Sequence, residues 1–256
     1  QACGDIGPGR MLEPETIALM AADLFETGLL SGKHVVITAG PTREAIDPVR
    51  YISNHSSGKM GYALAVAARD AGARVTIISG PVTIPAPDHI TVIPAYSARE
   101  MLETSLAQLG QCDIFIAAAA VADYRPIAPE AEKIKKSSET VELTLVKNPD
   151  VVATVANHEL RPFTIGFAAE TQDIDTYARG KLVSKNLDMI VANDVSRSDI
   201  GFNSDENAVT VFWNQNQQSF EPRSKSALAA ELIDLIAHQY AAKQTDKDAT
   251  LTQEKG

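Results

Sequence analysis

The chain has 256 residues, with 33 acidic and 23 basic side chains, a formal charge of −10 and a pI near 5.0. This charge argues against nucleic acid as a partner, because binding to a phosphate backbone depends on Lys and Arg. Apolar residues make up 45% of the chain, which excludes a disordered protein. The longest strongly apolar run, 114–122, is far shorter than the roughly 20 residues that cross a bilayer. We therefore expect neither nucleic acid nor a membrane among its partners.

Cysteine and histidine are too sparse for a disulfide framework or a zinc site. Cys3 and Cys112 form no CxxC pair, and the five histidines show neither HxH nor HExxH spacing. The sequence thus predicts no protein-only metal site, and any metal should arrive with a ligand. The chain begins at Gln1 with no charged-then-apolar leader, so we expect a cytoplasmic fragment of a longer protein.

Strands and helices are expected to alternate through the first half of the chain. Short β-branched runs predict strands, and apolar residues at helical spacing predict helices between them. The expected elements are a strand over 34–39, a helix over 58–71 ending at Gly72, strands over 74–79 and 90–93, a helix opened by the capping box 97–100, and a strand over 113–119.

The second half repeats this alternation less regularly. It contains an expected strand over 141–146, a helix from Asn148-Pro149 to about Asn157, a strand over 164–168, a helix over 175–186, a strand over 189–192, a hairpin of 208–213 with 219–221, and a helix from Ser224 to about Tyr240. We predict an α/β protein with a Rossmann-like, mostly parallel sheet, helices on both faces and a β-hairpin extension. The segment 125–140 is rich in Pro and Lys and should form a mobile surface loop.

A glycine-rich segment, 56–61, begins the first of these helices. Backbone N–H groups and the helix dipole at such a position favour an anion, although the glycines could serve close packing alone. The pattern is not a Walker A motif, because Met60 stands where Ser or Thr should hold magnesium. A dinucleotide fingerprint is also excluded, since 18 positions separate Gly58 from Gly40 at the end of the preceding strand.

Small residues followed by an acid end the strand over 113–119. Ala117 to Ala120 leave the backbone accessible at a strand end, where open α/β sheets bind ligands, but they also suit tight helix packing. Asp123 could contact a ligand or cap a turn. Upstream, Arg50 offers a fork suited to phosphate or carboxylate, and Asn54 offers a donor and an acceptor, whereas a solvated loop would explain both equally well.

Two lysines and one aromatic residue complete the candidates. Lys181 and Lys185 are four positions apart on one predicted helix, where like charges repel, so a nearby anion would explain them, although exposed lysines on a solvated helix face are common. Phe167 ends a strand and could stack on a base or belong to the core.

Together these motifs closely resemble phosphopantothenoylcysteine synthetase. The resemblance covers about 31–240 and rests on the segments 40–42, 54–61, 117–123, 133–137, 148–150, 166–170 and 192–194. Residues 2–11 are similar to the last motif of the flavin-dependent phosphopantothenoylcysteine decarboxylase, which precedes the synthetase in bacterial fused proteins. The resemblance divides the chain into a decarboxylase remnant with linker (1–30), a synthetase domain (31–240) and a polar tail expected to be disordered (241–256).

This resemblance implies a two-step ligation in coenzyme A biosynthesis. The carboxylate of 4′-phosphopantothenate attacks the α-phosphate of CTP, and the amine of L-cysteine then displaces CMP from the acyl-cytidylate. Mg2+ would accompany CTP, and the enzyme would be a homodimer. FMN is expected only in the decarboxylase domain, outside this chain.

The resemblance also assigns roles to individual residues. Asn54 would orient the acyl-cytidylate carbonyl, Lys133 would cover the α-phosphate, and Cys3 would be the decarboxylase proton donor in the intact protein. The implied nucleotide site comprises Gly40, Ser56, Gly58, Gly61, Ala117, Ala118, Ala119, Pro149, Asp150, Val151, Val152, Phe167, Lys181, Lys185 and Asn193. The implied phosphopantothenate site comprises Asn54, Ala119, Ala120, Asp123 and, from the partner subunit, Arg50.

Two other functions stay open at this stage. A nicotinamide-dependent oxidoreductase would suit the fold, but a clear Tyr-xxx-Lys pair is missing, since Tyr177 and Lys181 match it only by spacing. A nucleotide-sensing module would bind without turnover, and the lysine-bearing loop argues against it. The preference for CTP over ATP rests on the resemblance alone.

Overall fold

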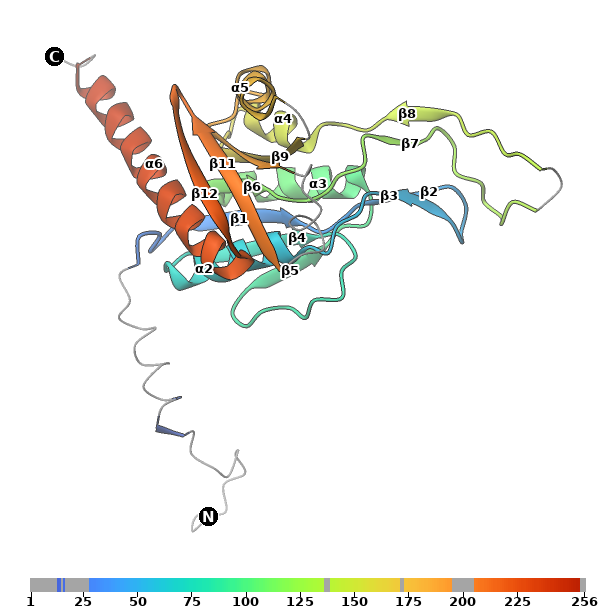
Figure 1. The fold of residues 1–256 in the computed structure, drawn as a ribbon, viewed down its shortest axis with the longest axis horizontal. Helices are drawn as coiled ribbons and strands as arrows, with labels where there is room; N and C mark the ends of the chain where they lie inside the picture. Colours follow the sequence, from blue (N-terminus) through green and yellow to red (C-terminus); the bar gives the residue numbers. More distant parts are fainter. Residues whose placement is uncertain are drawn as a thin grey trace, which may run out of the picture.

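An eight-stranded sheet forms the centre of the protein (Figure 1). The computed structural model describes residues 28–135, 139–170, 173–194 and 205–253, together with Glu13, Pro14 and Thr16. The strands are, in spatial order, β12 (Asn216–Ser224), β11 (Glu206–Trp213), β10 (Met189–Asp194), β9 (Phe163–Glu170), β6 (Ile114–Ala117), β1 (His34–Ala39), β4 (Arg74–Ser79) and β5 (Thr91–Pro94). Pairing is parallel from β10 to β5 and antiparallel at β11 and β12. The predicted fold class, including the hairpin extension, is confirmed.

Helices cover both faces of the sheet. α2 (Lys59–Asp70) and α6 (Lys225–Gln253) pack on one face, in one core with Val35 and Ile37 of β1. On the other face, α3 (Ala98–Gln108), followed by a 3-10 turn (Leu109–Gln111), and α4 (Val151–Ala156) pack with Val36, and α5 (Ile174–Ser184) packs beside α4. Successive strand residues face opposite sides, so the buried run over 34–39 serves both cores. No helix in the described part of the chain is long and apolar enough to cross a membrane.

Two predicted boundaries in the second half are wrong. The N-cap of α4 is Asp150, whose carboxylate accepts the Ala153 N–H at 3.0 Å. Asn148, predicted as that cap, is buried and donates from Nδ2 to the Ala122 carbonyl at 2.8 Å. The predicted strand over 141–146 is instead the short strand β8 (Leu145–Lys147). In both cases a contact with a distant segment outweighs the local signal.

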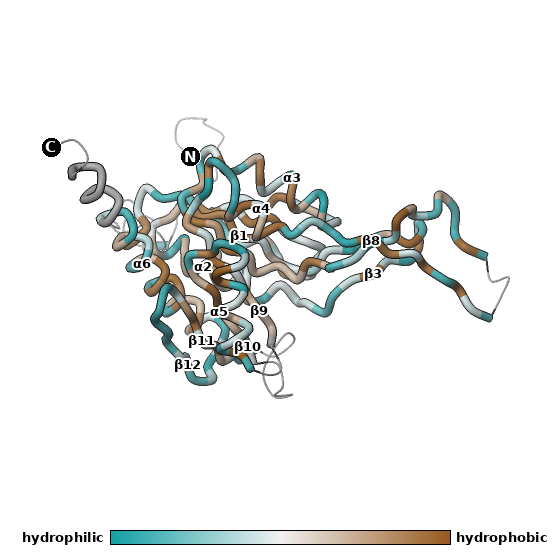
Figure 2. Tube along the Cα trace, turned by 90° about the horizontal axis from the view of Figure 1, so that it is seen from above, coloured by the Kyte–Doolittle hydropathy of each residue, from teal (hydrophilic) through white to brown (hydrophobic). Residues whose placement is uncertain are grey.

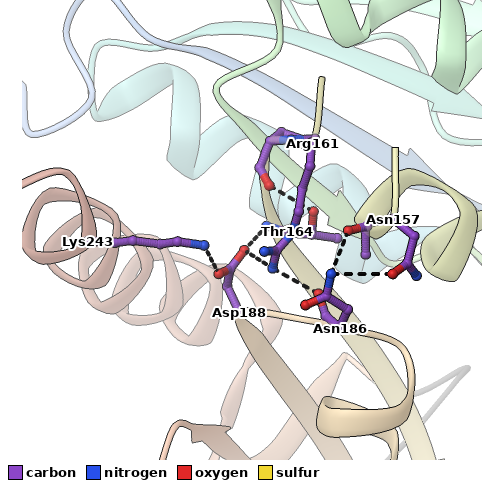
Figure 3. Close-up of polar contacts among 8 residues, drawn as sticks. Asn157, Arg161, Thr164, Asn186, Asp188 and Lys243 are labelled. Carbon is purple, nitrogen blue, oxygen red and sulfur yellow. Dashed lines mark hydrogen bonds and ion pairs between the residues drawn. The ribbon is translucent and has the colours of Figure 1, made fainter. Parts of the chain in front are cut away.

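The final helix continues well beyond Tyr240, where the sequence analysis ended it, so the disorder expected from 241 is wrong as far as Gln253. Asp188 at the start of β10 explains part of this extension (Figure 3). Its carboxylate pairs with Lys243 of α6, accepts Arg161 Nη2 at 3.0 Å and accepts the Thr164 N–H at 2.8 Å. The helix is therefore still docked after the predicted end.

Two short hairpins form an arm that extends away from the sheet (Figure 1). They are β2 (Arg43–Ala45) with β3 (Tyr51–Ser53), and β7 (Tyr124–Pro126) with β8. We use "the arm" for residues 43–53 and 124–147. The predictions for this part of the chain were a loop over 125–140, of which 136–138 lie outside the described residues, and the strand over 141–146. Figure 2 shows apolar segments along the arm, far from the core. The large apolar side chains exposed on the arm are Val49, Tyr51, Tyr124, Ile127, Val141, Leu143 and Leu145.

Gly61 on α2 should be essential for the contact between α2 and β1. A Cβ at this position would lie 2.6 Å from the Cβ and 3.2 Å from the Cα of Ala39, which is closer than atoms pack. We expect Gly61→Ala to lower the free energy of unfolding by about 1–3 kcal/mol, because the helix must move off the strand. Urea unfolding followed by circular dichroism measures this change.

Gly180→Ala on α5 is the matched control. No atom lies within 4 Å of a Cβ built at Gly180, so the same substitution should stabilise its helix by up to about 1 kcal/mol. Equal effects of the two substitutions would show that the α2–β1 contact is not the cause.

Candidate functional site

The carboxyl ends of the parallel strands border a cavity of about 510 Å³. Such an edge is where open α/β sheets bind ligands, because the loops that follow the strands meet there. Its wall comes from the start of α2, the ends of β6, β9 and β10, and the starts of β11 and α6. The lining residues are Asn54 to Gly61, Ala118 to Val121, Asp123, Phe167 to Ala169, Lys181, Asn193, Asn207 and Lys225.

The glycine-rich segment presents the start of α2 to this cavity. Gly58 is the N-cap, with φ of 77°, and makes no side-chain cap hydrogen bond. The Lys59 N–H donates to Ser57 Oγ at 3.5 Å, and Met60 and Gly61 line the cavity, so the start of α2 and the positive end of its dipole favour an anion there. Close packing is equally evident, because a Cβ at Gly40 or at Gly58 would lie 2.7 Å from Val82 Cγ1. Anion binding and close packing, the two interpretations of these glycines that the sequence left open, are thus compatible.

Gly40 does not line this cavity but positions one of its walls. Its carbonyl accepts the Ala120 N–H at 2.9 Å, and the Thr42 hydroxyl accepts the Ala122 N–H at 3.0 Å. The segment that follows β1 thereby holds the small residues that follow β6, which line the cavity. The carboxamide of Asn54 donates to the Val121 carbonyl at 3.0 Å and belongs to the same wall.

Three lysines line this cavity of about 510 Å³. Lys59 pairs with Asp205 at 2.6 Å, and Lys181 projects from α5. Lys225 is 7% exposed, and its pKa is lowered by burial and by the Lys59 charge. None of the sequence motifs indicated Lys225 or Asn207. The one signal available for Lys225 was its place in the first turn of a helix, where the helix dipole disfavours a cation.

A second cavity of about 210 Å³ adjoins the first on the opposite face of the sheet edge. Ala119, Val121, Asp123 and Phe167 line both cavities. The smaller one also includes Thr38, Ala117, Ala122, Lys147 to Val152 and Lys185. Phe167 is both packed against the core and exposed to the cavities, so both interpretations of it hold.

Lys181 and Lys185 line different cavities although one turn separates them. Lys181 lines the larger cavity, while Lys185 lines the smaller one and pairs with Asp150 at 2.9 Å. Asp150 also caps α4, so it fixes Lys185 against the helix start. This ion pair offsets the like-charge repulsion that the sequence suggested.

Arg50 and Lys133, by contrast, line neither cavity and lie on the arm. Asp47 holds the tip of the β2–β3 hairpin, accepting Arg50 Nε at 3.0 Å, Arg50 Nη2 at 2.5 Å and the N–H groups of Val49 and Arg50 at 2.8 Å. It also accepts the Ile134 N–H at 3.1 Å, and Arg50 Nη2 donates to the Ile134 carbonyl at 3.2 Å. The two hairpins are therefore tied together beside Lys133. Cys3 lies outside the described residues.

No group of three or more His, Cys, Asp or Glu side chains is placed to hold a metal ion within the described ranges. The larger cavity nevertheless contains oxygen donors, in Asn54, Asp123, Asn193 and Asn207. Asn207 Nδ2 donates to Asn193 Oδ1 at 3.1 Å, which orients the two amides.

Residues 30–240 match the family described as the DNA/pantothenate metabolism flavoprotein C-terminal domain. The chain belongs to this family. It is 57% identical over 242 residues to the coenzyme A biosynthesis bifunctional protein CoaBC of Vibrio cholerae, covering 93% of this chain and 61% of the relative. With CoaBC of Escherichia coli K12 it shares 50% identity over 248 residues, 95% of this chain and 61% of the relative. The chain therefore spans about three fifths of these relatives, and the resemblance inferred from the motifs is confirmed.

Two solved structures share the fold. A crystal structure of the C-terminal domain of CoaBC superposes with a TM-score of 0.72 at 37% identity, covering 84% of this chain and all of that one. A Cab2 H337A variant in complex with phosphopantothenate-cysteine gives a TM-score of 0.66 at 14% identity, covering 92% of this chain and 97% of that one. At that identity the second likeness supports the fold alone.

The arm should depend on the charge of Asp47. The Arg50 guanidinium holds the pKa of this carboxyl well below its usual range. Because the folded-state pKa is depressed, the stabilisation is present above the ordinary carboxyl pKa, about 4, and is lost as pH falls through the lower folded-state value. At pH 7 we expect Asp47→Asn to raise amide exchange at Val49, Arg50 and Ile134 at least tenfold, with exchange in β1 unchanged.

Glu130→Gln serves as the control, since it removes one exposed negative charge from the same arm. Hydrogen exchange read by mass spectrometry measures both variants. Unaltered exchange in the Asp47 variant would contradict the assignment of Asp47 as the residue that ties the hairpins together.

Proposed function

We propose that this chain ligates 4′-phosphopantothenate to L-cysteine in coenzyme A biosynthesis, using CTP and passing through an acyl-cytidylate. The observation that carries this proposal is the pair of adjoining cavities at the sheet edge. One holds a helix N-terminus and three lysines, and the other is lined by strand ends and the start of α4. A nucleotide needs such a pair, with an anion site for its phosphates and an adjoining pocket for its nucleoside.

In the first step, a carboxylate oxygen of phosphopantothenate forms a bond to the α-phosphorus of CTP. The bond to the β-phosphate oxygen breaks, and pyrophosphate leaves with the electron pair. Charge on the phosphates is stabilised by the N–H groups of α2 and by Lys59 and Lys181, with Lys133 closing over the α-phosphate.

In the second step, the cysteine nitrogen attacks the acyl carbon, CMP leaves, and the amine loses its proton as the amide forms. Asn54 is held at the cavity wall by its hydrogen bond to Val121. Its carboxamide orients the acyl carbonyl on which negative charge develops in the transition state.

The nucleoside occupies the smaller cavity. Backbone groups of Ala117 to Ala119 and of Pro149 to Val152 face the base and ribose, and Phe167 and Lys185 complete the wall. Backbone recognition leaves no side-chain signature for cytosine, so the choice of CTP rests on the family resemblance. Asp123 and Ala120 contact the pantothenate part from the larger cavity.

A homodimer brings in the residues that one chain leaves outside its cavities. Arg50 lies on the arm, and its bond to the Ile134 carbonyl fixes it beside Lys133. The two residues therefore move together, and both serve the partner's site, Arg50 at the phosphopantothenate phosphate and Lys133 at the α-phosphate. The exposed apolar side chains along the arm suit burial against a second copy.

Mg2+ fits the larger cavity as a companion of the triphosphate. Among the described residues, the one carboxylate that lines this cavity is Asp123, which suits a hard cation that keeps phosphate and water ligands. When bound, it neutralises phosphate charge and orients the phosphates. We also propose that the intact protein is cytoplasmic, and that it carries FMN and Cys3 in a fused decarboxylase domain.

The proposal is tested by omitting cysteine. The purified chain is incubated with phosphopantothenate, Mg2+ and CTP, with ATP and NADPH in parallel reactions, and the products are read by mass spectrometry. We expect pyrophosphate and an acyl-cytidylate with CTP alone. No acyl-nucleotide with any of them, from folded dimer, would favour a nucleotide-sensing module.

Asn54→Ala separates the two steps. If Asn54 acts in the second step, the variant should accumulate acyl-cytidylate while product formation falls at least tenfold. Asn157→Ala, an exposed residue at the end of α4 outside both cavities, should leave both quantities unchanged. Falling product without accumulation of the intermediate would refute this role.

A further inference from the structure

Lys225 is the first residue of α6 and one of the most buried lysines that the structure describes. Only 7% of it is exposed, yet it lines the larger cavity. Its backbone N–H donates to the Asp205 carbonyl at 2.9 Å, which fixes the start of the helix. Lysine is rarely buried so deeply, and the start of a helix disfavours a cation. The charge of Lys225 lies at the wall of the cavity, where a bound anion would stabilise it further.

The charges around Lys225 point to an anion of more than one charge. Burial lowers the pKa of Lys225, Lys59 lowers it further, and Asp205 acts in the opposite direction. Lys181 lines the same cavity. Helices α2 and α6 pack against each other with both N-termini at this end (Figure 1). Three lysines and two helix starts thus converge in a chain whose overall charge is −10.

The arrangement of the two cavities places Lys225 near the terminal phosphates of a bound nucleotide. Lys225 lines the larger cavity and is absent from the wall of the smaller one, where the nucleoside is placed. The α-phosphate must lie at the shared wall, near Ala119 and Asn54, because the substrate carboxylate reacts there. Phosphates beyond it therefore extend toward the starts of α2 and α6.

We infer that Lys225, assisted by Lys59, binds the two terminal phosphates of the nucleoside triphosphate and the pyrophosphate that leaves. This inference rests on the proposed function and adds a residue that none of the motifs indicated. The two lysines differ in mobility. Lys59 makes an exposed ion pair with Asp205, which contributes little and exchanges readily for a phosphate, whereas burial fixes Lys225 in place beforehand.

The test uses inorganic pyrophosphate and CMP as probes, with calorimetry on the whole chain in Mg2+. We expect Lys225→Met to weaken pyrophosphate binding at least tenfold and raise the KM for CTP, while CMP binding changes less than twofold. Lys225→Arg retains the charge and should keep most of the affinity. Arg99→Met, which removes one exposed positive charge from α3, should bind both probes as the wild type does.

Lys225→Gln is made in parallel in case the methionine variant does not fold. The inference is overturned if a folded Met or Gln variant binds pyrophosphate with wild-type affinity, or if it loses CMP and pyrophosphate equally, which a purely structural role predicts. In both cases the proposed function stands. If the wild type binds no pyrophosphate and forms no acyl-cytidylate, the proposed function fails.

Discussion

The contact between the start of α2 and the end of β1 is the constraint on which the site depends. Gly61 brings the helix so close to Ala39 that no side chain fits between them, and Gly58 and Gly40 both lie against Val82. This contact aims the start of α2 at the carboxyl edge of the sheet. It also leaves space for a cavity between α2 and the strand ends, so the packing of the fold and the anion site have one cause.

The sheet edge divides the site into two parts with different chemistry. Beside the starts of α2 and α6, the larger cavity collects Lys59, Lys225 and, from α5, Lys181. Beside the start of α4, the smaller cavity has Lys185 held by Asp150. The proposed reaction would bind a polyanion and a neutral heterocycle side by side, on the two sides of the wall that Ala119, Asp123 and Phe167 share.

The arm has a separate physical basis. It has little core of its own, and its two hairpins are joined by the carboxylate of Asp47, which Arg50 and Ile134 contact from different segments. A buried carboxylate with that many donors is well ordered, but it holds Arg50 and Lys133 outside the cavities of their own chain. The arrangement makes sense when a second subunit is present, as the proposed homodimer requires.

The sequence by itself determined the sheet, because buried strands such as 34–39 and 74–79 are short runs rich in β-branched residues, and it located most cavity residues through motifs at strand ends. In the arm it indicated only one strand, over 141–146, with the wrong bounds, because strands of three residues are too short to show a pattern. Only the tertiary structure decided that Asp150 caps α4, since the Asn148 side chain donates to the Ala122 carbonyl instead. It alone extended α6 beyond Tyr240, through Lys243 and Asp188, and brought Lys225 beside Lys59. These outcomes depend on contacts between residues far apart in the chain, and local patterns do not record them.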